Sequence, residues 1–158
     1  MNEVRQLRWG ALPVLLLLLG SGQGCGGDST AEVQVIHGRR LYETSCGSCH
    51  QLGGEGKYGV ASPLAESSWV VESVERLVRI ALHGVRGPIE VKGKWYNLEM
   101  PGFDRAYDDT QIAAILTYIR QAWGNSASAV SPETVAAIRV KEKERGDSWT
   151  AEELLVLD

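Results

Sequence analysis

Apolar residues recur at intervals of three and four along most of the chain after residue 32. In the segment V-E-R-L-V-R-I-A-L-H, the side chains of Val74, Leu77, Val78, Ala81 and Leu82 would line one face of a helix. The same spacing predicts five helices, over residues 33–45, 73–84, 108–125, 131–145 and 150–157. The chain is therefore expected to be predominantly helical.

Helix-capping residues support these segments. Glycine after a helix allows a left-handed turn, and a hydroxyl or carboxylate before a helix accepts a bond from a free backbone N–H. The capping signals are Gly84, Asp109 or Thr110, Gly124 with Asn125, Ser131 with Pro132, and Thr150 with Glu153.

One segment instead shows apolar and polar residues in alternation. G-P-I-E-V-K-G-K-W-Y-N, residues 87–97, predicts a small hairpin that turns at Lys-Gly-Lys. No other strand pair and no internal repeat is visible. Before the second helix, residues 53–63 are rich in glycine and form a loop without a regular period. Together these patterns predict an all-α fold with a hairpin insertion.

Residues 1–25 have the pattern of an export signal. Arg5 and Arg8 precede the apolar run Ala11 to Leu19, and small residues follow it. The run is about half of the ~20 residues that a membrane-spanning helix needs, so a cleaved signal is favoured over a retained anchor. Cys25 follows directly and resembles the lipidated cysteine of bacterial lipoproteins, although Gly22 and Gln23 depart from that pattern. We therefore expect either lipidation of Cys25 or its loss with the signal, and a polar tether over residues 26–35.

Length and charge narrow the function classes. The 158 residues are enough for one domain with extensions. The formal net charge is −4, and loss of residues 1–24 would remove two arginines and one glutamate and leave −5. No basic patch appears, which argues against a nucleic-acid partner.

The segment C-G-S-C-H, residues 46–50, carries the candidate chemistry. Cys46 and Cys49 could form a redox disulfide, half of a zinc site, or the attachment point of a haem whose iron His50 binds. A structural zinc needs four ligands, and no second Cys pair is present. A thioredoxin-like pair belongs to an alternating α/β pattern, which the chain lacks. Covalent haem is therefore the favoured interpretation in an exported chain.

A haem iron has two axial positions, and His50 could fill one. Met100 is the one methionine that remains after residue 1 and lies in a polar segment that no periodicity explains. It is the candidate second ligand, because Met with His gives an electron carrier of raised potential. His83 is the rival, but its place before Gly84 favours a helix C-terminal role. His37 is expected to be a surface or packing residue.

These residues resemble a class I (mono-haem) cytochrome c. The resemblance rests on G-R-R-L-Y before C-G-S-C-H, the S-P-L loop, the late M-P, and the last-helix segment T-Y-I-R-Q-A-W-G-N. It implies helices packed around one covalently bound haem c, with the first and last helices crossing near Gly38 and Tyr118. It also implies that the Pro63 carbonyl accepts a hydrogen bond from the His50 ring and orients it.

A narrower similarity points to a partner. The run from S-S-W-V through L-H-G-V-R-G-P-I-E to M-P-G-F resembles cytochrome domains that accompany periplasmic pyrroloquinoline-quinone-dependent sugar or alcohol dehydrogenases. We therefore expect a cytochrome c domain over residues 36–125, a helical C-terminal extension over residues 126–158, and a periplasmic dehydrogenase as the electron donor. The extension would either dock onto a partner or act as a strap around the core.

The expected function is single-electron transfer in a periplasmic respiratory chain. An apolar wall would limit access of water to the iron. Its candidate residues are Val60, Leu64, Trp69, Leu77, Leu98, Phe103 and Leu116. The alternative is a haem enzyme of the peroxidase kind, or a haem-based ligand sensor, which would need an open sixth position on the iron.

Overall fold

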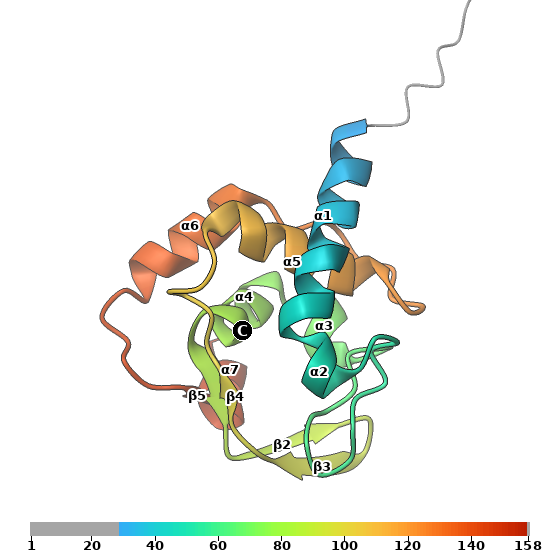
Figure 1. The fold of residues 1–158 in the computed structure, drawn as a ribbon. Helices are drawn as coiled ribbons and strands as arrows, with labels where there is room; N and C mark the ends of the chain where they lie inside the picture. Colours follow the sequence, from blue (N-terminus) through green and yellow to red (C-terminus); the bar gives the residue numbers. More distant parts are fainter. Residues whose placement is uncertain (1–28, 158) are drawn as a thin grey trace, which may run out of the picture.

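The computed structural model describes residues 29–157, and the predicted signal and Cys25 lie outside this part of the chain. In the view of Figure 1, α1, α5 and α6 lie in the upper part of the molecule, and the strands β2 and β3 run along its lower edge. The helices are α1 (Ser29–Ser45), α2 (Gly47–His50), α3 (Ser68–Val71), α4 (Val74–His83), α5 (Asp109–Gln121), α6 (Pro132–Lys141) and α7 (Ala151–Val156). The strands are β1 (Gly84–Arg86), β2 (Pro88–Val91), β3 (Lys94–Asn97), β4 (Met100–Pro101) and β5 (Trp149–Thr150). No helix among residues 29–157 is both long enough and apolar enough to cross a membrane.

The α1 helix crosses α5 at Gly38 (Figure 1). A Cβ atom at Gly38 would overlap the backbone carbonyl oxygen of Ala114 and would lie 3.1 Å from the Tyr118 Cβ. The backbones can approach this closely only because residue 38 has no side chain. The predicted crossing near Gly38 and Tyr118 is therefore confirmed.

Three aromatic side chains extend this contact toward the end of α1. Tyr42, Tyr118 and Trp123 lie with ring centroids 5.0–5.5 Å apart in tilted and edge arrangements. The Tyr42 hydroxyl donates to the Gln51 carbonyl at 2.6 Å, and the Trp123 Nε1 donates to the Leu52 carbonyl at 3.1 Å. The helix crossing thus holds the chain that follows His50.

All five predicted helices are present, but several ends differ: α5 and α6 end at Gln121 and Lys141, about four residues earlier than predicted. The α5 N-cap is Asp108, whose carboxylate accepts from the Gln111 N–H in a capping box, one residue before the predicted cap. The α1 helix begins at Ser29, so residues 29–35 are helical rather than part of a tether. Tertiary contact explains the longer helix, because the Gln34 amide donates to the Val130 carbonyl at 3.3 Å.

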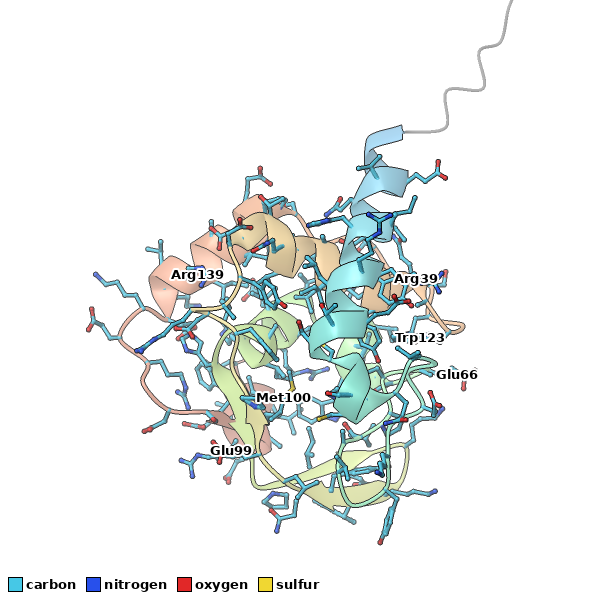
Figure 2. The ribbon with its side chains drawn as sticks, viewed as in Figure 1. Arg39, Glu66, Glu99, Met100, Trp123 and Arg139 are labelled. Atoms are coloured by element: carbon cyan, nitrogen blue, oxygen red, sulfur yellow. The ribbon has the colours of Figure 1, made fainter. Side chains whose placement is uncertain are left out.

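The C-terminal extension packs on the core. Val135 and Ile138 of α6 are buried in the main hydrophobic cluster. Arg79 of α4, which is 1% exposed, forms an ion pair with Glu142 at 2.9 Å. Arg139, labelled in Figure 2, pairs with Asp109 at 2.7 Å and donates to the backbone carbonyls of Asp104 and Tyr107. Residues 132–142 therefore brace both α4 and the entry to α5.

The predicted hairpin is confirmed as β2 and β3, which pair from Pro88↔Asn97 to Val91↔Lys94. Lys92 and Gly93 at its tip both have positive φ, as a two-residue primed turn requires. A second sheet was not predicted. It has the order β4-β1-β5, in which β1 pairs antiparallel with β4 and parallel with β5. Strands of two or three residues leave no alternation in the sequence, which explains the omission.

Replacing Gly38 with alanine should destabilise the fold. The overlap with Ala114 should lower the free energy of unfolding by about 1–3 kcal/mol, which exceeds the roughly 1 kcal/mol that alanine adds as a better helix former. Gly146→Ala is the matched control, since nothing lies within 4 Å of a Cβ there. Denaturant unfolding followed by circular dichroism measures both, and equal midpoints would show that the crossing tolerates a side chain.

Candidate functional site

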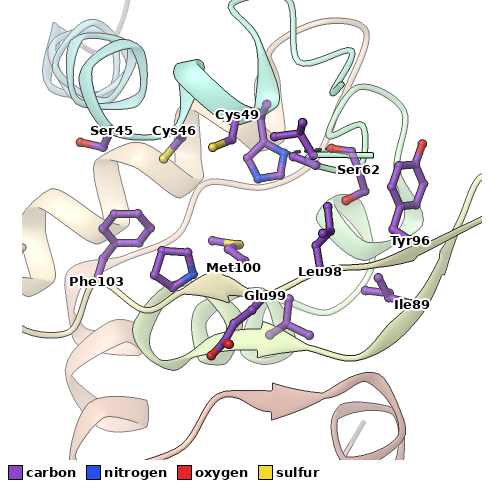
Figure 3. A pocket seen from close by; sticks show the side chains of 15 residues that line it. Ser45, Cys46, Cys49, Ser62, Ile89, Tyr96, Leu98, Glu99, Met100 and Phe103 are labelled. Atoms are coloured by element: carbon purple, nitrogen blue, oxygen red, sulfur yellow. Dashed lines mark hydrogen bonds between the residues drawn. The ribbon is translucent and has the colours of Figure 1, made fainter. Parts of the chain in front are cut away.

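One hollow, partly open to solvent, gathers most of the predicted site residues (Figure 3). Its empty volume, which includes space open to solvent, is about 730 Å³. Its lining is mostly apolar and comes from the end of α1, from α2, from residues 60–62, and from the β1–β4 region. The lining residues are Ser45, Cys46, Cys49, His50, Val60, Ala61, Ser62, Val85, Ile89, Tyr96, Leu98, Glu99, Met100, Pro101 and Phe103.

Cys46, Cys49 and His50 reach the hollow from a tight turn at the end of α1. The Cys46 N–H donates to the Tyr42 carbonyl at 2.8 Å, and the His50 N–H donates to the Cys46 carbonyl at 2.9 Å. This turn directs two thiols and one imidazole to the same space. The two thiols are free, and burial raises the pKa of Cys46 to about 11, with a further contribution from Cys49.

The His50 ring is oriented by the loop that follows it. Its Nδ1 lies 2.9 Å from the Ser62 carbonyl and must donate, because a carbonyl can only accept. The neutral ring then has its lone pair on Nε2, the nitrogen free to bind a metal. Burial lowers the pKa of His50, which keeps the ring neutral.

The resemblance implies that the Pro63 carbonyl accepts the hydrogen bond from the His50 ring. In the structure the carbonyl of Ser62, the residue before Pro63, accepts it instead. Proline restricts the residue before it to extended backbone. Pro63 thus acts on His50 by limiting the conformation of Ser62, rather than by its own carbonyl group.

Met100 lines the hollow from the other side. Figure 3 shows its side chain across the space from Cys46 and Cys49, with Leu98 and Glu99 beside it. Met100 is the first residue of β4, and its strand partner is Val85 of β1. A sulfur atom and an imidazole are therefore presented to one cavity by segments fifty residues apart.

Only some of the predicted wall residues line this hollow. Val60, Leu98 and Phe103 do. Leu77 and Leu116 lie in the main core cluster instead, and Leu64 packs against that cluster. Trp69 packs against a second cluster with Ile80, Trp149 and Leu154, where Met100 and Val85 also lie.

The hairpin supplies two lining residues that sequence reasoning missed. Ile89 and Tyr96 are paired across β2 and β3 and both face the hollow. Alternation along the predicted hairpin could have found them, since side chains two residues apart share a face.

The other two histidines lie away from the lining. His83 ends α4, and its Nε2 is buried without a hydrogen-bond partner among the described residues. Burial lowers the pKa of His83. His37 is exposed on α1, as predicted.

Comparisons with known proteins agree with this geometry. A family model described as cytochrome c matches residues 35–123. Cytochrome c-552 of Thermus thermophilus is 36% identical over 124 residues, which cover 75% of this chain and 91% of the relative. The chain belongs to the cytochrome c family. The cytochromes c of this family are electron carriers rather than enzymes, so the peroxidase alternative is set aside.

Two further relatives of this cytochrome c are parts of dehydrogenases. The cytochrome c subunit of a quinone alcohol dehydrogenase from Gluconacetobacter polyoxogenes is 33% identical over 108 residues. The cytochrome c subunit of gluconate 2-dehydrogenase from Pantoea cypripedii is 31% identical over 111 residues. Each match covers 66% of this chain but only 22% and 24% of those proteins, respectively.

Family membership implies a covalently bound haem c with its iron, and the residues in the hollow fit that group. Two free thiols, an oriented imidazole and a thioether converge on a mostly apolar space. Cys46 and Cys49 would hold the porphyrin edge as thioethers. When bound, the haem accepts and releases one electron.

Replacing Cys46 and Cys49 together with serine should abolish covalent attachment. The mass of the denatured chain should then equal that of the polypeptide alone, and haem staining of a denaturing gel should be lost. Ser48→Ala, in the same turn but outside the lining, is the control and should keep the haem. Retained covalent haem in the double variant would show that attachment lies elsewhere.

Proposed function

We propose that this cytochrome c is an exported electron carrier whose haem iron is bound by His50 and Met100. The observation that carries the proposal is that both side chains line one hollow. Met100 lies across this space from Cys49, the residue before His50 (Figure 3). Methionine paired with histidine fills both axial positions and raises the reduction potential. With neither position open, the iron is suited to exchange electrons rather than to bind small ligands.

The surroundings of both ligands favour electron transfer with little rearrangement. His50 is 9% exposed and is held by the Ser62 carbonyl, while Met100 is held in a strand. Ligands held on a fixed backbone change little between the two oxidation states, which keeps the barrier low. Val60 and Leu98 line the same hollow yet are 42% and 44% exposed, so one edge of the site faces solvent. A redox partner would approach at this edge.

The electron donor that we propose is a quinoprotein dehydrogenase in the periplasm, from which the electron passes to a downstream respiratory acceptor. Similarity to cytochrome c subunits of quinone-linked alcohol dehydrogenases supports this assignment. The net charge of −5 that the chain would have without residues 1–24 favours a partner with a basic docking surface. The export pattern of residues 1–25 supports a location outside the cytoplasm, where the donor would also have to lie, and lipid on Cys25 would hold this protein at the membrane.

Substitution of Met100 tests the axial ligand. Met100→Ala should keep the covalent haem, lower the reduction potential, and allow carbon monoxide to bind the ferrous protein, because the sixth position opens. The far-red absorption band of a Met-ligated ferric haem should disappear. Leu98→Ala, beside Met100 in the lining, should keep the band. An unchanged potential and spectrum in Met100→Ala would remove Met100 from the iron.

Purification from the membrane fraction of the source organism tests the partner and the location. We expect a quinoprotein dehydrogenase to copurify with the haem-staining protein, and the mass of its N-terminal peptide to match a chain that begins at lipidated Cys25. Cys25→Ser should move the protein to the soluble fraction. An N-terminal peptide that retains residues 1–24 would contradict cleavage of the signal. Copurification with a different oxidoreductase would contradict a quinoprotein dehydrogenase as the donor.

A further inference from the structure

The strand that carries Met100 is too short to be stable by itself. The β4 strand has two residues, and its only sheet neighbour among residues 29–157 is β1, which has three. The free edge of β1 is filled by β5 from the C-terminal extension. Val85 lies opposite Met100 on one side and opposite Trp149 on the other. The extension therefore completes the sheet that holds Met100.

Side chains reinforce this backbone pairing. Trp149 is 4% exposed and packs in one cluster with Ile80 and Leu154, against which Met100 also lies. The Ser148 hydroxyl donates to the Glu99 carboxylate at 3.0 Å, directly beside Met100. Glu99 and Met100 are labelled together in Figure 2. The extension thus touches the methionine and the residue that precedes it.

The extension is itself anchored around Trp149. The Arg145 guanidinium lies 3.3 Å from the centroid of the Trp149 ring and bonds both oxygens of Glu153, at 3.0 and 2.9 Å. Glu153 and Thr150 form the capping box that begins α7. Leu154, the residue after Glu153 in α7, is fully buried. These contacts fix Trp149 in one position.

We propose that residues 145–154 form a positioning strap that holds Met100 at the haem iron, with Trp149 as its central residue. The proposal rests on Met100 being the axial ligand, as proposed above. Loss of the strap would leave β4 paired with a β1 strand whose other edge is open, and would remove both the cluster around Trp149 and the Ser148–Glu99 bond. The methionine would then compete less well against other ligands for the sixth position, and the reduction potential would fall toward that of a haem without methionine.

Binding of added imidazole to the ferric protein measures this competition. Trp149→Ala should bind imidazole about tenfold or more tightly than the unmodified protein and should have a lower reduction potential. Trp149→Phe should restore most of the original behaviour. The Trp149 Nε1 has no hydrogen-bond partner among residues 29–157, so phenylalanine removes no hydrogen bond that the structure describes.

A matched control separates positioning from general stability. Val135→Ala also truncates a fully buried side chain of the extension, but in the main core cluster rather than beside Met100. It should lower the denaturant midpoint without changing imidazole affinity. If Trp149→Ala does not fold, Ser148→Ala, which removes only the bond to Glu99, should shift imidazole affinity in the same direction by a smaller factor.

A double-mutant cycle distinguishes failure of the strap from failure of the ligand assignment. Met100→Ala alone should raise imidazole affinity, and adding Trp149→Ala to it should change the affinity no further. If Met100→Ala leaves the affinity unchanged, the axial assignment is wrong. If Met100→Ala raises it while folded Trp149→Ala and Ser148→Ala do not, Met100 is the ligand but the strap does not position it. If Trp149→Ala raises affinity equally in both backgrounds, the effect does not act through Met100, and the proposal is overturned.

Discussion

The close approach of α1 and α5 at Gly38 is the contact on which the rest of the structure depends. Because residue 38 has no side chain, the α1 backbone lies against Ala114, and Tyr42 then meets Tyr118 and Trp123. Two of these rings also bond the carbonyls of Gln51 and Leu52. The residues that follow His50 are thus held in place by the contact between α1 and α5, two helices that lie far apart in the sequence. A site built from a short turn gains its rigidity from this long-range contact.

Sequence reasoning located the parts of the site that have local signals. The C-G-S-C-H turn, the helix that ends there and the hairpin all show patterns within a dozen residues, and the structure has each of them. The helix crossing near Gly38 and Tyr118 was predicted from resemblance to a family, because the spacing of these residues does not by itself indicate a crossing. The wall of the hollow was harder to predict. Leu77 and Leu116 belong to helix faces as apolar as any other, and only the packing decides that they face the core.

The sheet that holds Met100 could not be predicted. Its strands come from residues 84–86, 100–101 and 149–150, and each is too short to carry an alternation of apolar and polar positions. Their pairing follows from tertiary packing of Trp149 and Met100 against the same cluster. The acceptor for His50 was missed for a similar reason. Ser62 and Pro63 are adjacent, and backbone geometry alone decides which carbonyl faces the ring.

The two walls of the hollow are therefore built by different means. The cysteine and histidine wall is shaped by bonds within residues 42–62, and the α1–α5 contact supports it through Tyr42 and Trp123. The methionine wall depends on pairing of β1 with β4, 15–17 residues later, and with β5 of the C-terminal extension, 64 residues later. A change in the extension would then weaken the methionine wall while the attachment turn stays intact. With Met100 as the proposed axial ligand, this separation would allow the potential to be adjusted from the C-terminal segment without disturbing the covalent hold on the cofactor.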